Sequence, residues 1–453
     1  MAALRLWAPR AWLPSGWADD VLLEADARGQ WASVRADVAA VDAPQATRLA
    51  GVLLPGLVNA HSHAFQRAIA GLTERRAGGH DDFWSWRDRM YRAALRIDPD
   101  QLETIAAQLY AELLQHGYTQ VCEFHYIHQD PAGRPYADPA EMSLALVRAA
   151  QRTGIGLTLL PTLYMHSGFG GQPLRDDQRR FASTPQQIAD LVAQVDRLQV
   201  PTVNTGIALH SLRAVGMPAL REACEAIGPQ RPVHIHIAEQ TQEVDACIAA
   251  CGARPVEWLL GHAPVNARWH LVHATHASEA ELQATARAGA SVVICPSTEA
   301  NLGDGFFNLP AWQRAGGRWS IGSDSHVSRD WAEELRLLEY GQRLLHRQRN
   351  VAAGPEHDGS TAAQLLSQAL QGGAAACGLP AGTLASGFRA DACEIDTDSP
   401  ALLGMPPSHA LDALVFSSPT AQCRQAWVAG RAAHPDRQRI GADFARTMAA
   451  LWR

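Results

Sequence analysis

The chain has 453 residues, of which 47% are hydrophobic and 19% are charged. This composition can bury a large core, and the length predicts one large domain plus a smaller one rather than a single small domain. The formal net charge is −7 and no run of basic residues occurs, which argues against nucleic acid as a partner.

The cysteine pattern and the N-terminal sequence indicate the compartment. The eight cysteines are scattered without paired Cys-x-x-Cys modules, so neither a disulfide scaffold nor a zinc ribbon is expected. Arg5, Pro9, Arg10 and Pro14 interrupt the first apolar pieces, so no signal-peptide core forms, and no apolar span reaches membrane length. We therefore expect a cytoplasmic protein that does not engage a membrane.

The N-terminal residues 1–54 have β character. Their apolar residues predict strands at 21–25 and 31–35, which a turn at 26–29 connects. A hairpin of this size cannot bury a core by itself, so it needs strands from elsewhere in the chain.

From Pro55 onward, short apolar runs alternate with segments of helix length. Helical periodicity is evident at 100–116 and at 138–153, where the second segment ends near Gly154. The eight apolar runs are 57–63, 119–126, 156–164, 204–211, 232–239, 269–276, 291–299 and 318–325. Eight strand–helix units over residues 55–377 predict an α/β fold, a (β/α)8 TIM barrel with insertions, whose chemistry belongs at the carboxyl ends of the strands.

After a last barrel helix at about 360–376, the chain returns to β character. Strands are predicted at 384–392 and 425–431. We expect residues 1–54 and 378–440 to form one small discontinuous β-sandwich domain. A C-terminal helix over 441–453 would present Phe444, Met448 and Leu451 on one face, which indicates packing.

The first barrel run ends with two histidines. Residues i and i+2 of a strand point to the same side, so His61 and His63 present their imidazoles together, where a divalent metal could take both. Taken alone, a His-x-His pair is as well explained by solvated or core histidines. The rest of the chain must supply the other ligands.

Further candidate ligands follow the later runs. His236 ends the fifth run, and Glu239 lies just past it, within reach of a metal-bound water. His273 ends the sixth run and Asp324 the eighth. Three imidazoles, a carboxylate and a water suit Zn²⁺ or a similar borderline ion. A structural histidine or a capping aspartate explains each residue alone, but the ordered set at strand ends predicts a metal centre.

These ordered motifs resemble the amidohydrolase superfamily. They comprise Pro-Gly-Leu-Val-Asn-Ala-His-Ser-His from Pro55, His-x-x-Glu after the fifth strand, a histidine after the sixth and Ser-Asp-Ser after the eighth. A discontinuous sandwich is also typical of that family. The resemblance implies as metal ligands His61, His63, His236 and Asp324, and as catalytic residues Glu239, His273 and Asp324. No lysine ends a predicted strand as a bridging ligand, so we expect a single metal, Zn²⁺ or another divalent ion.

More narrowly, several segments resemble the branch of this superfamily that deaminates formiminoglutamate in histidine degradation. The segments are 61–67, 83–87, 124–126, 208–213 and 271–276. The likeness covers essentially the whole chain. It implies a metal-dependent hydrolytic deaminase that converts N-formimino-L-glutamate and water into N-formyl-L-glutamate and ammonia.

This chemistry assigns a role to each catalytic candidate. The metal lowers the pKa of its bound water toward neutrality, and Asp324 takes the proton as the formimino carbon is attacked. Glu239 carries a proton to the leaving nitrogen. His273 polarises the reacting group or stabilises the charge of the tetrahedral intermediate.

A substrate with two carboxylates requires cationic donors. Arg87 and Arg213 are the candidates, because a guanidinium binds a carboxylate through two parallel hydrogen bonds. His210 and Tyr126 could add donors, and Gln66 could bond the α-substituents or the amidine. Packing or lid roles are expected for Trp84 and Trp86, and supporting or structural roles for His125, His234, His276 and His326.

Two other functions remain open from the sequence. A deaminase of a guanine- or adenosine-type ring could use the same scaffold, but a pocket for a flat base has little need for two arginines. A non-catalytic barrel that serves as a scaffold or binding protein would have lost metal ligands or the acid–base residue, and none is lost. Zinc deaminases with His-x-Glu and Pro-Cys-x-x-Cys are excluded because that signature is absent. The expected partner is a small dicarboxylate substrate, and a homodimer stays an open option.

Overall fold

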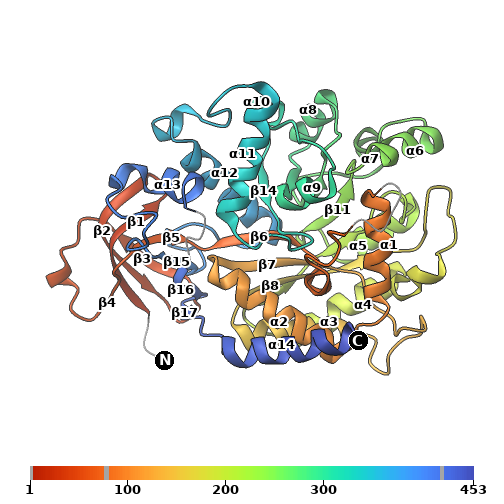
Figure 1. The fold of residues 1–453 in the computed structure, drawn as a ribbon, viewed down its shortest axis with the longest axis horizontal. Helices are drawn as coiled ribbons and strands as arrows, with labels where there is room; N and C mark the ends of the chain where they lie inside the picture. The colour runs from red at the N-terminus through yellow and green to blue at the C-terminus, as the bar shows by residue number, and fades with distance from the viewer. Residues whose placement is uncertain (1–3, 76–80, 419–422) are drawn as a thin grey trace.

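A ring of parallel strands forms the centre of the computed structural model, which describes residues 4–75, 81–418 and 423–453 (Figure 1). The strands are β6 (Leu57–Ser62), β7 (Tyr118–His125), β8 (Gly156–Leu163), β9 (Val203–Thr205), β10 (Ile207–Leu209), β11 (Val233–Ile237), β12 (Trp269–His273), β13 (Ser291–Ile294) and β14 (Trp319–Ile321). Neighbours pair in parallel in the order β6, β7, β8, β10, β11, β12, β13, β14. The expected barrel is confirmed.

The first and last barrel strands meet at their carboxyl ends. Ser62 forms a parallel bridge with Asp324, the Asp324 N–H donates to the His61 carbonyl over 3.0 Å, and the His63 N–H donates to the Asp324 carbonyl over 3.3 Å. Closure of the ring therefore brings residues near the two ends of the barrel sequence into contact. Most strand residues are buried, as expected for parallel strands that helices cover.

Several barrel strands end before the predicted residue, and two runs change structure within the predicted range. The run predicted at 204–211 is divided into β9 and β10 at Gly206, where a Cβ atom would lie 2.5 Å from the Pro232 carbonyl oxygen. The run predicted at 291–299 ends as a strand at Ile294. Pro296 then begins a helix, because its fixed φ suits the first helical position.

Helices surround the ring. They are α1 (Phe83–Ala94), α2 (Pro99–Gln115), α3 (Glu141–Thr153), α4 (Pro185–Arg197), α5 (Met217–Ala226), α6 (Thr241–Cys251), α7 (Pro255–His262), α8 (Glu279–Arg287), α9 (Pro296–Leu302), α10 (Leu309–Arg314), α11 (Trp331–His346) and α12 (Thr361–Cys377). Short 3-10 helices lie at Ala40–Asp42, Ala64–Ala68, Asp176–Phe181, Pro355–His357 and Pro407–His409. Capping residues define several starts, as where Asp98 accepts from the Gln101 N–H and Pro99 follows.

A second sheet is built from both ends of the chain. Its strands are β1 (Arg5–Leu13), β2 (Gly16–Ala25), β3 (Trp31–Arg35), β4 (Thr47–Arg48), β5 (Val52–Pro55), β15 (Ala392–Ile395), β16 (Cys423–Val428) and β17 (Arg431–Ala432). The order is β17, β16, β15, β5, β1, β2, β3, with β4 beside β1. Figure 1 shows the red and blue strands side by side at one end of the molecule. The expected joining of the two chain ends is confirmed.

In the C-terminal region, the strand predicted at 384–392 is wrong except at its last residue, and the C-terminal helix differs in its boundaries. The strand predicted at 384–392 begins only at Ala392, because the preceding residues turn at Gly387, whose φ is +87°. Helix α13 spans Ala410–Phe416. Helix α14 spans Arg437–Leu451 and so begins before the predicted residue, with the Asp436 side chain as its cap. It packs beside α2, with Leu451 buried (Figure 1).

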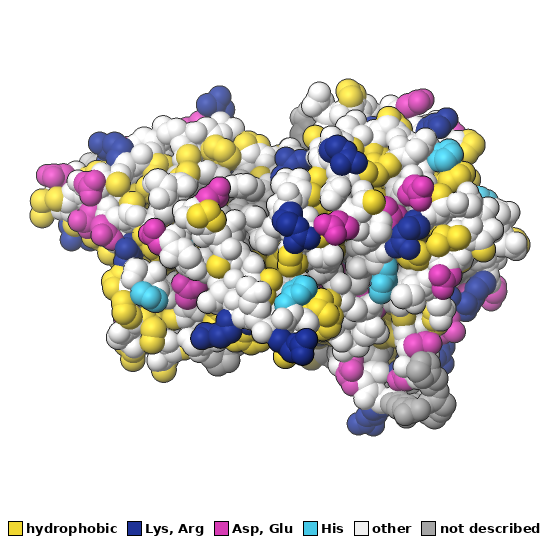
Figure 2. Space-filling view, turned by 90° about the horizontal axis from the view of Figure 1, so that it is seen from above, with side chains coloured by type: hydrophobic (Ala, Val, Ile, Leu, Met, Phe, Trp, Pro, Cys, Tyr) yellow, Lys and Arg dark blue, Asp and Glu magenta, His cyan; other side chains and the backbone are white. Residues whose placement is uncertain are grey.

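The surface agrees with the charge balance of the sequence. On the face in Figure 2, basic and acidic side chains are interspersed rather than gathered by sign. This face therefore offers no basic stripe of the kind that binds a phosphate backbone. In the described part of the chain, no helix is both long and apolar enough to cross a membrane.

Candidate active site

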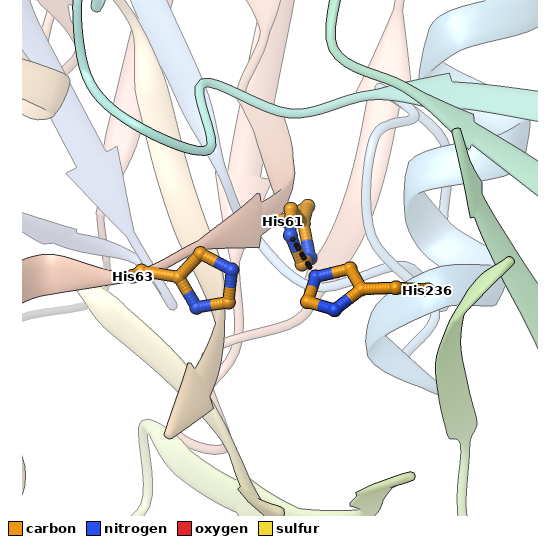
Figure 3. Close-up of side chains that lie close together, drawn as sticks. All are labelled: His61, His63 and His236. Atoms are coloured by element: carbon orange, nitrogen blue, oxygen red, sulfur yellow. Dashed lines mark hydrogen bonds between the residues drawn. The ribbon is translucent and has the colours of Figure 1, made fainter. Parts of the chain in front are cut away.

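Four predicted metal ligands converge at the carboxyl end of the barrel. Figure 3 shows the imidazoles of His61, His63 and His236 turned toward one another, and the Nε2 atoms of His61 and His236 are 3.0 Å apart. Asp324 Oδ1 lies 3.4 Å from the Nε2 atoms of both His61 and His63. All four side chains are buried. The structure therefore brings together the ligand set predicted from strands β6, β11 and the turn after β14.

The electrostatics of this cluster suit a cation. Burial lowers the pKa of His61 to about 3 and lowers the pKa values of His63 and His236, so the imidazoles are neutral and offer lone pairs. Burial opposes ionisation of Asp324, but its hydrogen bond and charge interaction with His61 lower its pKa below the usual range. Three neutral imidazoles and an ionised carboxylate form a donor set that fits Zn²⁺.

Backbone geometry at two of these strand ends is unusual. Asp324 has φ +44°, and His273 and Ala274 have φ +69° and +49°. Residues with side chains rarely adopt this region, and such strained positions cluster at functional sites, where the surrounding structure holds them. The carboxylate and the imidazole are therefore placed by turns that the barrel fixes.

Glu239 and His273 lie beside the ligand cluster. His273 Nε2 is 3.7 Å from Glu239 Oε1 and 3.9 Å from Asp324 Oδ2. Burial raises the pKa of Glu239. Burial opposes the charge on His273, but Glu239, the Glu299 hydrogen bond and Asp324 raise its pKa to about 10. The pair thus combines a carboxyl group that can exchange protons near neutral pH with a cationic imidazole.

A cavity adjoins these residues. Every site residue predicted from the sequence lines it except His61, which lies at its edge against His63, His236 and Asp324. Apolar and aromatic side chains complete the wall, among them Phe83, Trp86, Met90 and Tyr91. A largely apolar cavity with a few convergent polar groups is typical of small-molecule sites.

Arg87 and Arg213 reach the cavity from different elements. Arg87 lies on α1, and Arg213 follows β10. Within the described residues, neither guanidinium has an ion-pair partner, and the Nε atom of each is buried without a hydrogen bond. The guanidinium carbons lie 4.4 and 5.7 Å from the Trp84 ring centroid, respectively. Two guanidinium groups that form no ion pair within the described chain thus face the cavity.

The remaining predicted substrate residues line the same cavity. The Gln66 amide donates to the Tyr126 hydroxyl over 3.2 Å, and Gln66 Oε1 is buried without a partner. The His210 ring lies 5.2 Å from the His236 ring and packs on Tyr164 at 4.2 Å. Gln66 therefore offers an acceptor and His210 an imidazole beside the ligand cluster.

Other histidines near the site do not line the cavity. His234 Nε2 is 2.9 Å from the Ala376 carbonyl, His276 Nε2 is 2.8 Å from the Asp304 carbonyl, and His326 Nδ1 is 2.9 Å from Ser323 Oγ. His125 packs edge-on against His128. These contacts are compatible with the supporting roles expected from the sequence.

Sequence reasoning missed several acidic residues around the site. Glu299 accepts from His273 Nδ1 at 3.2 Å, and burial raises the pKa of Asp304 to about 9. Burial raises the pKa of Glu123 to about 8, and this residue accepts from the Ala64 N–H and the Ser62 hydroxyl beside the first ligand pair. The one sequence signal that could have identified them as site residues is their position, which is shortly after a barrel strand for Glu299 and Asp304 and within a barrel strand for Glu123.

Comparisons with known proteins agree on the family. The amidohydrolase family matches residues 52–433. The chain is 49% identical to the formimidoylglutamate deiminase of Pseudomonas aeruginosa over 94% of this chain and 93% of that protein. It is 28% identical to a 5-methylthioadenosine/S-adenosylhomocysteine deaminase of Haloquadratum walsbyi over 79% of this chain and 73% of that protein.

Solved structures share the whole architecture. An amidohydrolase from Brucella melitensis superposes with a TM-score of 0.94 at 42% identity, over 99% of this chain and 100% of that one. An adenosine deaminase from Xanthomonas campestris, solved with bound zinc, has a TM-score of 0.79 at 22% identity over 99% and 98% of the two chains. At that identity the second likeness concerns the fold alone.

Proposed function

Because the chain belongs to the amidohydrolase family, we propose that it is a metal-dependent deaminase that hydrolyses N-formimino-L-glutamate to N-formyl-L-glutamate and ammonia. The observation that carries the proposal is the pair Arg87 and Arg213. Both face the cavity that holds the ligand cluster, and neither has an ion-pair partner in the described chain. In a substrate with two carboxylates and an amidine, the carboxylates would pair with the two arginines, and the amidine would lie at the ligand cluster. The 49% identity to a formimidoylglutamate deiminase supports the same substrate.

The proposed resident metal is one Zn²⁺ per chain, held by His61, His63, His236 and Asp324. The fit rests on three buried neutral imidazoles that converge with an ionised carboxylate. When bound, a divalent metal there would lower the pKa of water and stabilise developing negative charge.

Asp324, Glu239 and His273 divide the proton transfers. Asp324 is ionised and sits among the ligands, so it accepts a proton from the attacking water. Glu239 takes up that proton and delivers it to the leaving nitrogen, since its raised pKa allows both states near neutral pH. His273 directs Nε2 toward Glu239 and Asp324, where its N–H stabilises charge on the reacting group.

The remaining residues hold the glutamate part of the substrate. Arg87 and Arg213 each pair with a carboxylate, and their charges offset the desolvation of that group. Gln66 Oε1 accepts from an N–H of the substrate, because it is buried without another donor. Tyr126 and His210 border the same cavity and add hydrogen-bonding groups.

An ammonia-release assay tests the proposal against its main competitor. Purified enzyme of measured metal content is offered N-formimino-L-glutamate, N-formimino-L-aspartate, a formamidine without carboxylates, guanine and adenosine. We expect turnover of formiminoglutamate to exceed that of the formamidine without carboxylates and of the purines by more than about 10³-fold, because buried arginines left unpaired penalise ligands that lack carboxylates. Preference for a purine would refute the substrate assignment and leave the family assignment intact.

A further inference from the structure

The imidazole of His273 is held from behind by Glu299. His273 Nδ1 and Glu299 Oε1 are 3.2 Å apart, and both side chains are almost fully buried. The other ring nitrogen, Nε2, faces Glu239 and Asp324. A hydrogen bond at Nδ1 fixes both the rotation of the ring and the nitrogen that carries that proton.

Glu299 is itself fixed by the backbone that follows β13. The same Oε1 atom accepts from the Cys295 N–H over 2.9 Å, and the Glu299 N–H donates to the Cys295 carbonyl over 2.9 Å. The Asp304 N–H donates to the Glu299 carbonyl over 2.9 Å. The carboxylate therefore has little freedom to move away from His273.

His273 is the side chain that partners the Glu299 carboxylate. In the described ranges, no arginine lies within ion-pair distance of this carboxylate, whereas His273 Nδ1 lies 3.2 Å from Oε1. A buried carboxylate oxygen needs hydrogen-bond donors, and the Cys295 N–H and the His273 ring both approach Oε1. The left-handed backbone at His273 adds to the need for such an anchor.

We propose that Glu299 is a positioning residue that holds the His273 ring through Nδ1, so that Nε2 is directed at the reacting group. This inference deepens the proposed deaminase function and rests on it for its kinetic test. Glu299 does not line the cavity, and His273 is the cavity residue that its carboxylate contacts, so we expect its effect on the substrate to pass through His273.

The kinetic test compares E299Q, H273N and the double variant on N-formimino-L-glutamate. We expect E299Q to lower kcat about 10- to 100-fold while KM and metal content stay within twofold, as for a group that orients a catalytic residue. In the H273N background the same substitution should change kcat less than twofold, because the residue through which it acts is gone. Wild-type kcat in E299Q, or equal losses in both backgrounds, would overturn the proposal.

E334Q is the matched control. Glu334 is also a buried carboxylate, and it lies on α11. It accepts from the N–H of Ser297 over 2.8 Å and from the Ser297 hydroxyl over 2.6 Å, and Ser297 lies on α9, as Glu299 does. No hydrogen bond or ion pair joins Glu334 to His273 in the described chain. If loosening α9 were sufficient, E334Q would lower kcat as much as E299Q. We expect E334Q to remain within about twofold of wild type, and equal losses would refute the positioning role.

Histidine-¹⁵N NMR spectroscopy separates this proposal from the substrate assignment. The His273 Nδ1–H signal, identified by its loss in H273N, should exchange slowly with solvent in the wild type and disappear in E299A, without any substrate present. An unchanged signal in E299A would overturn the positioning role. Absence of wild-type turnover on formiminoglutamate would instead refute the proposed function, and the NMR comparison would still decide the role of Glu299.

Discussion

The cavity has two parts that are built differently. The metal part consists of His61, His63, His236 and Asp324, which lie on barrel strands or in the turn where the first and last strands join. The arginine part consists of Arg87, Arg213 and Trp84, which lie on α1 or just after β10. Within the metal part the side chains contact one another, with separations of 3.0 to 3.4 Å. Within the arginine part, both guanidiniums lie near the Trp84 indole ring, and that of Arg87 also lies over the Tyr91 ring.

The difference separates chemistry from specificity. The barrel sheet holds the metal part in place before any ligand arrives, which suits groups that must stabilise a transition state. In the described chain, the guanidiniums of the arginine part form no ion pair, so the carboxylates of the proposed substrate would supply their partners. Because the arginine part lies on a helix and a loop outside the barrel strands, substitutions there can leave the metal part undisturbed.

The largest expected effect comes from breaking the metal part. His236→Ala should lower the bound metal from one equivalent to well below that and reduce turnover more than about 10³-fold, since a metal supplies several kcal/mol of transition-state stabilisation. Elemental analysis and ammonia release measure the two effects. His262→Ala, far from the cavity on α7, serves as a control and should keep both. An unchanged metal content in His236→Ala, or two metals in the wild type, would contradict the proposed ligand set.

Glu239→Gln should separate catalysis from metal binding within the same part. The amide keeps the shape of the side chain but cannot exchange a proton with water or the leaving nitrogen. We expect turnover to fall about 10²- to 10⁴-fold, with metal content and thermal stability near wild type. Near wild-type turnover would show that Glu239 has a structural role only.

The arginine part should show a different signature. Arg213→Met and Arg87→Met keep much of the bulk and remove the charge, so each should lower kcat/KM on formiminoglutamate about 10²-fold while metal content stays constant. Arg175→Met is the control, because Arg175 lies near Tyr91 but pairs with Asp88 and Asp177 outside the cavity. If kcat/KM stayed at the wild-type value in both cavity variants, the proposed dicarboxylate substrate would be refuted.

The metal part could be predicted from the sequence because strand geometry fixes it. His61 and His63 share a side of one strand, and His236 ends another, so a barrel forces them together once the strands are recognised. Arg213 could be predicted for the same reason, because it follows a strand. Arg87 came from the family resemblance rather than from strand position, since nothing in a helical pattern states which cavity a helix covers.

The role of Glu299 could not be predicted from the sequence. The apolar run from 291 predicts a strand through 299, whereas Pro296 begins a helix and turns Glu299 back toward the Cys295 N–H and His273. Its role depends on contacts between segments that are distant in sequence, and no local pattern reports such contacts. Asp304 was missed likewise, because it lies in a loop whose path α9 determines.

The smallest expected effect tests what holds the two arginines together. The Trp84 ring lies near both guanidiniums, at 4.4 Å from Arg87 and 5.7 Å from Arg213. Trp84→Leu removes an interaction of about 0.5–2 kcal/mol, so kcat/KM on formiminoglutamate should fall about 3- to 30-fold, mainly through KM, with metal content unchanged. Trp84→Phe keeps an aromatic face and should recover most of the loss. If Leu and Phe gave equal losses, the indole would act through its bulk, and the arginines would be positioned by the walls of the cavity instead.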